Sequence, residues 1–373
     1  MTGWRAFALS VAIVTASWCL WSGLNYDVEP LSVDVLAGLD VGEASSRVSV
    51  VVVDDASLDA IGERWPISRS RFAELLAILR ELDAAAVGLD VVFREPSNPQ
   101  VPPSVRAQLN SPELGAELRE FLEPDALLAQ ELSRTDRVVL GTVLTAEHPP
   151  RFSTRLTDSN AVNDLSMPGE GASISNIAVA TEWHGVLNVP MDADGAIRRH
   201  SRTYDGYGSL AAVLVERVQP GSVNWDSQGI VLLRLLDPES FERVRLSDLL
   251  RGREAFREVI EGRVVLIGAD SELDRRVLYG AYRVPGVLVH ATAVDNLLHG
   301  EQWQMDGMAA WLGALLTFLC HIAIGLGLER GGVARAVSMI AAVVVLFCTA
   351  WLVAFLSAGW VWVTLPAEIG TAS

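Results

Sequence analysis

The chain has 373 residues, of which 50% are hydrophobic, and yet its formal net charge is −17. All 29 basic residues are Arg, since the sequence contains no Lys. Chemistry that needs a lysine of this chain is therefore excluded, including the P-loop lysine, the ATP-pairing lysine of protein kinases and Schiff-base formation. The negative charge also argues against nucleic acid as a partner, because binding it requires basic patches.

Three apolar stretches without Asp, Glu or Arg lie near the two ends of the chain: residues 6–24, 308–328 and about 336–358. Each is long enough for a helix that crosses a hydrocarbon core of roughly 30 Å. The short loop between the last two carries Arg330 and Arg335, so the positive-inside rule places this loop in the cytoplasm. Residues 26–306 hold all the acidic residues except Glu329 and Glu368. This acidic block is then expected outside the cytoplasm.

These features predict a multi-pass protein of the cytoplasmic (inner) membrane with three parts. Residues 1–25 form an N-terminal membrane anchor, residues 26–306 an extracytoplasmic domain, and residues 307–373 a C-terminal transmembrane hairpin with a short tail. Whether residues 359–373 enter the membrane again, as a fourth transmembrane segment, is not decided by the sequence.

The middle block alternates between strand and helix patterns. Residues 48–53 are a β-branched run typical of a strand buried on both faces, and Ser68 opens an amphipathic helix of about fifteen residues. The elements expected after it are strand 86–93, helix 125–134, strands 137–144, 186–190 and 196–203, helix 208–218, strand 262–268 and helix 287–299. This order predicts an α/β fold with a mostly parallel or mixed sheet flanked by helices, in addition to three or four transmembrane helices.

Ligands of open parallel sheets bind beyond the carboxyl ends of the strands. Three such ends carry acids or a glycine: Asp54 and Asp55, Asp90, and Gly268. If the carboxylates of Asp54, Asp55 and Asp90 converge, they supply the oxygen ligands that a divalent cation such as Mg²⁺ or Ca²⁺ prefers. The alternative is structural: Asp54 or Asp55 caps the following turn, and Asp90 accepts a hydrogen bond from Arg69 or Arg71.

Arg69 lies in the first turn of the helix that Ser68 opens, within the segment Trp65-Pro66-Ile67-Ser68-Arg69. A positive charge at this place opposes the helix dipole. We therefore expect Arg69 to pair with an acid such as Asp90, the alternative being contact with a ligand.

Two further candidates each have a structural interpretation. Asp192-Ala193-Asp194-Gly195 is similar to the start of a calcium-binding loop, but position 12 of that loop is Thr203 instead of Glu. The pattern therefore favours a β-turn. His290 lies early in the last helix without a second imidazole three or four positions on, which is more typical of a buried core residue than of a metal ligand.

Several motifs together carry a family resemblance: Val51-Val52-Val53-Asp54-Asp55-x-Ser57-Leu58, Trp65-Pro66-x-x-Arg69, Gly88-Leu89-Asp90-Val91-Val92-Phe93, Gly185-x-x-Asn188, Asp192-x-Asp194-Gly195-x-x-Arg198, Val265-Leu266-Ile267-Gly268, Asp274 and Pro285-Gly286-Val287-x-x-His290-Ala291. In this order, over most of residues 45–300, the chain resembles the CHASE2 family of extracytoplasmic sensory domains of bacterial membrane receptors. The resemblance and the strand ends together mark candidates for ligand binding or signalling: Asp54, Asp55, Trp65, Arg69, Asp90, Asp194, Arg198, Gly268, Asp274 and His290.

The resemblance implies a membrane-anchored sensor that relays a signal by helix displacement and is not an enzyme. The sequence also lacks GxSxG, HExxH and CxxC motifs. This sequence holds no output domain, so the relay requires either a continuation of the chain or a separate cytoplasmic effector such as a cyclase or kinase. The ligand is an unidentified small molecule or protein, and a homodimer is compatible with this role. No cofactor is expected apart from the divalent cation discussed above. The alternatives are an extracytoplasmic metal-dependent enzyme that uses Asp54, Asp55 and Asp90, and a non-signalling membrane scaffold.

Overall fold

The computed structural model describes residues 33–93, 124–143 and 183–300, apart from residues 36, 193, 205, 224, 226–228 and 281. It also describes short pieces at 153–154, 165–166, 304–305, 319 and 360–361, and parts of 334–349. The chain divides into two compact units, one of residues 42–301 and one of residues 1–41 with 302–372. In the second unit β16 (Gln304–Met305) pairs in parallel with β17 (Trp360–Val361).

The centre of the 42–301 unit is a six-stranded sheet in which every neighbouring pair is parallel. Its strands, in spatial order, are β12 (Glu242–Arg245), β1 (Val48–Val53), β13 (Val264–Ala269), β2 (Ala86–Leu89), β3 (Val138–Thr142) and β6 (His184–Val186). Every residue of β1, β13, β2 and β3 is buried, which explains their continuous apolar runs. The predicted α/β fold with a parallel sheet is confirmed.

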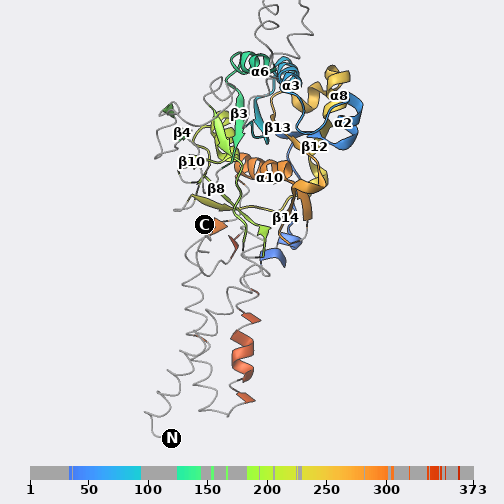
Figure 1. Cartoon of the computed structure of the whole chain (residues 1–373). Helices are drawn as coiled ribbons and strands as arrows, with labels where there is room; N and C mark the ends of the chain where they lie inside the picture. The colour runs from blue at the N-terminus through green and yellow to red at the C-terminus, as the bar shows by residue number, and fades with distance from the viewer. Residues whose placement is uncertain are drawn as a thin grey trace, which may run out of the picture. The chain divides into compact units, whose positions relative to one another are not determined.

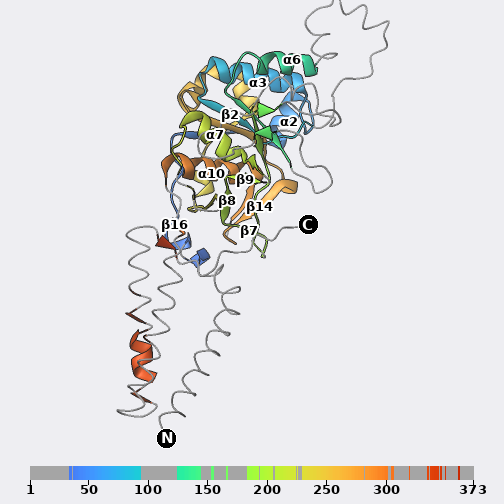
Figure 2. The ribbon, with the colours of Figure 1, turned by 90° about the vertical axis from the view of Figure 1, so that its left-hand side faces the viewer.

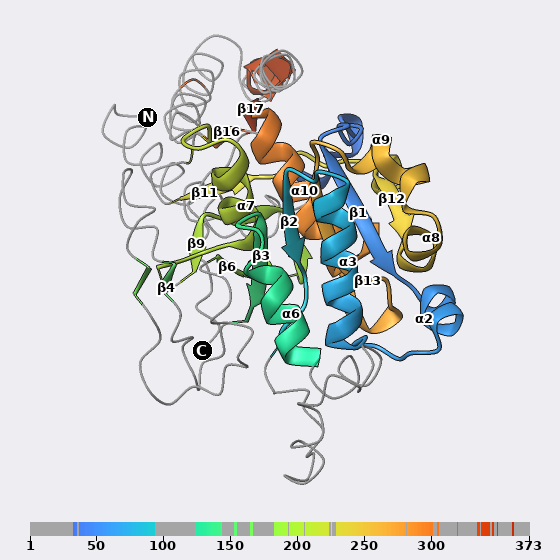
Figure 3. The same cartoon turned by 90° about the horizontal axis from the view of Figure 1, so that it is seen from above.

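Helices cover both faces of this sheet (Figures 1 and 2). On one face lie α3 (Arg69–Glu81) and α6 (Pro124–Leu132), onto which Figure 3 looks from above. On the other face lie α7 (Leu210–Val218) and α10 (Gly286–His299), both labelled in Figure 2. Successive side chains of a strand point to opposite faces of the sheet, so the strands contribute to the core on both faces. Val51 and Val53 of β1 lie in the same hydrophobic cluster as the apolar residues of α3, whereas Gly268 of β13 contacts Val287 of α10.

Small sheets lie beyond α10. The hairpin of β14 (Arg275–Leu278) and β15 (Tyr282–Pro285) takes β7 (Ala196–Ile197) as a parallel third strand. Two antiparallel pairs are β8 (Arg199–Ser201) with β11 (Ile230–Leu232) and β9 (Thr203–Tyr204) with β10 (Tyr207–Gly208). Because strands β8 and β14 lie on the side of α10 that faces away from the large sheet (Figure 1), this helix is enclosed from both sides. The remaining elements are short: β4 (Ser153–Thr154), β5 (Leu165–Ser166), α2 (Asp55–Ile61), η1 (Pro238–Ser240), α8 (Leu246–Arg251), η2 (Arg253–Phe256), α9 (Arg257–Ile260) and η3 (Glu272–Asp274).

The local sequence explains how α3 begins and packs. The Ser68 side chain caps the helix by accepting a hydrogen bond from the backbone N–H of Arg71. The apolar residues at spacings of three and four, namely Phe72, Leu75, Leu76 and Leu79, are all buried in the core. The helix predicted after Ser68 is therefore confirmed.

The predicted membrane spans fall on residues that are mostly outside the described part of the chain. Residues 6–24 are wholly outside it, residues 308–328 are described at a single position, and residues 336–358 only in pieces. A search of the described residues finds no helix that is both long enough and apolar enough to span a membrane.

Candidate functional site

Asp54 and Asp55 are explained by the helix that follows β1. A carboxylate oxygen of Asp54 accepts a hydrogen bond from the Ser57 backbone N–H at 2.8 Å, and the other lies 3.1 Å from Nε of Arg245. Asp55 is exposed in the first turn of α2, where a negative charge is favourable. The capping interpretation of Asp54 is thus confirmed. No group of three or more His, Cys, Asp or Glu within the described residues could hold a metal ion, so cation binding stays a prediction.

Arg69 is buried and forms an ion pair with Asp125 in the first turn of α6. Its guanidinium group also lies 5.3 Å from the ring centroid of Phe93. The prediction of a salt bridge was right, but the expected acid, Asp90, was wrong. Trp65 packs edge-on against Phe72, with ring centroids 6.4 Å apart. This motif therefore joins α3 to α6 and to the end of β2.

Arg198 clamps the turn that contains Asp194. Its guanidinium group is buried and donates hydrogen bonds to Asp192 at 2.8 Å and to both carboxylate oxygens of Asp194 at 2.7 and 3.0 Å. The Arg198 hydrogen bond is the largest influence that lowers the pKa of Asp194. Gly195 has a φ of +80° and its N–H donates to the Asp192 carbonyl at 2.8 Å. The β-turn interpretation is therefore confirmed.

The remaining candidates, Asp90, Gly268, Asp274 and His290, converge at the N-terminus of α10. Nε2 of His290 lies 4.0 Å from Oδ1 of Asp90, which follows β2. A Cβ atom at Gly268 would lie 3.3 Å from Cβ of Asp90 and 2.6 Å from Cβ of Val287. The two strand ends and the first turn of the helix are therefore in direct contact.

Asp274 lies at the same end of the helix. A Cβ atom at Gly286 would lie 2.6 Å from Oδ2 of Asp274, so only glycine lets the first turn of α10 approach this carboxylate so closely. Oδ1 of Asp274 forms an ion pair with Nη2 of Arg276 at 3.0 Å. We call Asp90, Asp274, Arg276 and His290 the α10 cluster.

Burial shifts the titration of this cluster toward the neutral forms. The pKa of Asp90 is raised to about 7, first by loss of solvation and second by the nearby Asp274 carboxylate, while the charge of Arg276 opposes both. Loss of solvation lowers the pKa of His290 to about 4, with a smaller effect of the Arg276 charge and an opposing effect of the Leu187 carbonyl. His200 of β8, whose ring centroid lies 6.5 Å from that of His290, has its pKa lowered to about 3 by burial first and by His290 second.

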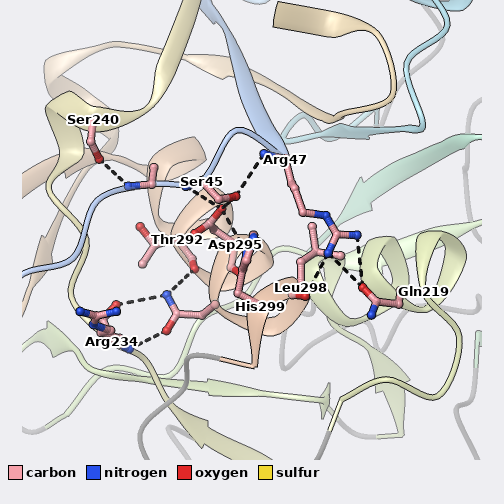
Figure 4. A network of polar contacts seen from close by, with 11 residues as sticks. Ser45, Arg47, Gln219, Arg234, Ser240, Thr292, Asp295, Leu298 and His299 are labelled. Carbon is pink, nitrogen blue, oxygen red and sulfur yellow. Dashed lines mark hydrogen bonds and ion pairs between the residues drawn. The ribbon is translucent and has the colours of Figure 1, made fainter. Parts of the chain in front are cut away.

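The other end of α10 carries a second polar group of residues, drawn in Figure 4. Asp295 is 2% exposed and accepts hydrogen bonds from both the backbone N–H and the hydroxyl of Ser45. The Ser45 hydroxyl accepts in turn from the backbone N–H of Arg47 at 3.1 Å. Nη1 of Arg47 donates to the Leu298 carbonyl and to Oε1 of Gln219, each at 3.2 Å.

Asn296 extends this group to the loop after β11. Its side-chain oxygen accepts from the Arg234 backbone N–H at 2.6 Å, and Nδ2 donates to the carbonyls of Arg234 and Thr292 at 3.1 and 2.9 Å. Nδ1 of His299 lies 3.1 Å from the Asp295 carbonyl, and the Ala44 backbone N–H donates to the Ser240 hydroxyl at 2.7 Å (Figure 4). We call Ser45, Arg47, Asp295 and Asn296 the junction network.

The interpretation of the sequence missed the junction network, together with Arg276 and His200. A signal was present for Asp295 and Asn296, because two adjacent polar residues in a helix that is mostly apolar need buried partners. Asp274 is the last residue of η3 and Arg276 lies in β14, so no single periodic pattern marked the two as neighbours. For His200 we find no comparable signal.

The chain was compared with known proteins. No curated protein and no solved structure matches it. The CHASE2 domain family matches residues 8–327, which is most of the chain. The matched range includes the residues at the N-terminus of α10, and CHASE2 domains are sensory and not catalytic domains. The chain belongs to the CHASE2 family, whose domains are extracytoplasmic sensory domains of membrane receptors.

Proposed function

We propose that this chain is a membrane-anchored extracytoplasmic sensor in which α10 relays a signal from the α10 cluster to the junction network. Helix α10 contributes His290 to the first group and Asp295 and Asn296 to the second. Its 14 residues span about 21 Å at a rise of 1.5 Å per residue. Residues 286–298 are all buried. Because a packed helix moves as a rigid body, a displacement at one end of α10 is transmitted to the other end.

The junction network supports this proposal because it joins the two places where the 42–301 unit continues into the rest of the chain. Ser45 and Arg47 follow its first residues, while Asp295 and Leu298 precede its last ones. A shift of α10 therefore changes how the incoming and outgoing segments are held together. This is the single observation that favours a relay over a passive scaffold.

The expected setting is the cytoplasmic membrane, with residues 6–24, 308–328 and about 336–358 as spans and the 42–301 unit outside the cytoplasm. The apolar composition of these stretches and the arginines at 330 and 335 support this topology. A cytoplasmic cyclase or kinase is the kind of effector that would receive the signal, and two copies of the chain suit a relay that changes the spacing of spans.

Site-directed crosslinking of the full chain in membranes tests the relay. Cys19, Cys320 and Cys348 are replaced by Ala, and a single Cys at Leu316 reports on crosslinking between two copies. Because Asp295→Ala breaks the junction network, we expect it to change the rate of crosslinking at position 316. The matched control, Asp59→Ala, removes an exposed carboxylate from α2 and should leave the rate unchanged. If Asp295→Ala protein is folded and crosslinks at the rate of the parent chain, the relay is wrong.

A labelling experiment tests the topology independently. In the same cysteine-free background, Ala60→Cys places a thiol on the exposed surface of α2. A membrane-impermeant maleimide should label it in intact spheroplasts as completely as in lysed ones. Labelling that appears only after lysis would place the domain in the cytoplasm.

A further inference from the structure

Asp90 is a nearly buried carboxylate that forms no ion pair with an Arg of the described residues, although the charge of Arg276 acts on it from a distance. The Asp90 side chain is 12% exposed, and Nε2 of His290 lies 4.0 Å from Oδ1 of Asp90, too far for a direct hydrogen bond. Burial of a carboxylate without a hydrogen-bonded or charged partner is costly. The site is therefore unbalanced by one negative charge whenever Asp90 is ionised.

The neighbouring elements do not correct this balance. From β14, Arg276 pairs with Asp274 at 3.0 Å, so its charge is already engaged by the second carboxylate. Arg275 points to Asp270 and Glu272, which lie 2.9 and 3.5 Å from its Nη2. From β15, Arg283 is exposed to solvent.

The two histidines nearby are neutral and add no positive charge. The His290 side chain is 4% exposed, and burial keeps its pKa near 4. Nδ1 of His290 is buried and has no hydrogen-bond partner within the described residues, and the same holds for Nδ1 of His200. Nε2 of His200 meets the hydroxyl of Ser209, the residue that caps α7, at 3.1 Å. Nε2 of His290 therefore faces Asp90 from the helix that we propose as the relay, while Nδ1 of the same ring is left without a partner in the described part of the chain.

We infer that Asp90 and His290 form a proton-binding site and that the proton is the ligand of this sensor. This inference rests on the proposed function, because α10 must transmit the change. The geometry provides the acceptors: one carboxylate and one neutral imidazole face each other in a buried place, with a second carboxylate nearby. The raised pKa of Asp90, about 7, agrees with loading and release of a proton within the range of ordinary external pH.

Protonation changes the forces on the first turn of α10. Ionised Asp90 is repelled by Asp274 and attracted by the positive N-terminal end of the helix. Both forces vanish when Asp90 takes up a proton. Gly268 lets Val287 pack directly against the end of β13 beside Asp90. Because this contact is tightly packed, a change in the force on the first turn shifts α10 as a whole.

The test titrates the full chain in membranes between pH 5.5 and 8.5, by infrared spectroscopy of protonated carboxyl groups and by crosslinking at position 316. In the parent chain we expect one carboxyl band to disappear with a midpoint near pH 7 and the crosslinking rate to change with the same midpoint. Asp90→Asn, which imitates the protonated form, should lack this band and keep the low-pH crosslinking rate throughout. Asp59→Asn, an exposed carboxylate on α2, should behave as the parent chain does.

A band that still titrates near pH 7 in the Asp90→Asn chain, or a parent crosslinking rate that does not depend on pH, would overturn the inference. Circular dichroism of Asp90→Asn establishes that the variant is folded before either result is counted. The outcome for the relay is separate. If Asp295→Ala alters crosslinking while pH does not, the relay stands and the proton is not its ligand. If neither alters it, the proposed function fails as well.

Discussion

The backbone N–H of Ser45 donates to a carboxylate oxygen of Asp295 at 3.2 Å, although 250 positions separate the two residues. The Ser45 hydroxyl donates to the same oxygen. This contact closes the 42–301 unit on itself, because the two residues lie close to its first and last positions. A buried carboxylate is therefore the link between the two ends of the domain.

Replacing that carboxylate should destabilise the domain. Asp295→Ala leaves the N–H and the hydroxyl of Ser45 without their acceptor in a buried place, which costs about 2–3 kcal/mol of unfolding free energy. Urea denaturation of the purified full chain, followed by far-ultraviolet circular dichroism, measures the loss. Asp59→Ala is the matched control on an exposed helix and should change the unfolding free energy by less than about 0.5 kcal/mol. Equal stability of the two variants would show that the Asp295 contacts contribute nothing.

The ion pair between Arg69 and Asp125 gives a second prediction. Both side chains are buried, so Arg69→Met removes the cation that pairs with the Asp125 carboxylate in the core and should destabilise the protein by about 3–5 kcal/mol. In the double variant Arg69→Met/Asp125→Leu both charges are gone, and most of this loss should be recovered. Denaturation of the wild type, the two single variants and the double variant measures the coupling. A double variant no more stable than Arg69→Met would show that the charge of Asp125 is not the cause.

Gly268 provides a third prediction, since it lets α10 lie against the end of β13. In Gly268→Ala the new Cβ would lie 2.6 Å from Cβ of Val287, so either the helix or the strand must shift. We expect a loss of about 1–3 kcal/mol and faster hydrogen exchange across residues 286–299. The control is Gly252→Ala, where no atom lies within 4 Å of the added Cβ. Unchanged exchange in Gly268→Ala would contradict the tight contact.

The strands of the sheet could be predicted from the sequence, whereas their order could not. The β-branched run of residues 48–53 and the apolar run of residues 264–269 predict buried strands from their composition alone. That β13 lies between β1 and β2, more than 170 positions away in the chain, depends on contacts that no local pattern records.

The same limit applies to the site. Asp90 and Gly268 could be predicted as neighbours because parallel strands end at one edge of a sheet. The sequence predicted that the charge of Arg69 pairs with an acidic residue. That this residue is Asp125 and not Asp90 depends on the packing of α6 against α3, which the sequence does not show. The junction network joins residues from both ends of the domain, so only the folded chain brings them together.

The last prediction concerns the pH dependence of stability. Because the pKa of Asp90 is higher in the folded chain than its usual value of 3.8, the folded state binds more protons at this residue between pH 3.8 and about 7. This contribution to stability is complete below pH 3.8 and is lost as the pH rises through about 7. His290 and His200, with pKa values lowered from 6.5 to about 4 and 3, act in the opposite direction, because unfolding lets them take up protons below pH 6.5.

In the parent chain Asp90 and His290 nearly cancel: between about pH 4 and 6.5 one proton resides on Asp90 when the chain is folded and on His290 when it is unfolded. Asp90→Asn removes one side of this balance. Its unfolding free energy relative to the parent should therefore rise by about 1.4 kcal/mol per pH unit from pH 4.5 to 6.5 and level off above pH 7. Urea denaturation of both chains at half-unit pH steps measures this slope, and the constant offset caused by the substitution itself does not affect it. A difference that stays flat across the whole range would mean that Asp90 is ionised in the folded chain, as an ordinary surface carboxylate is.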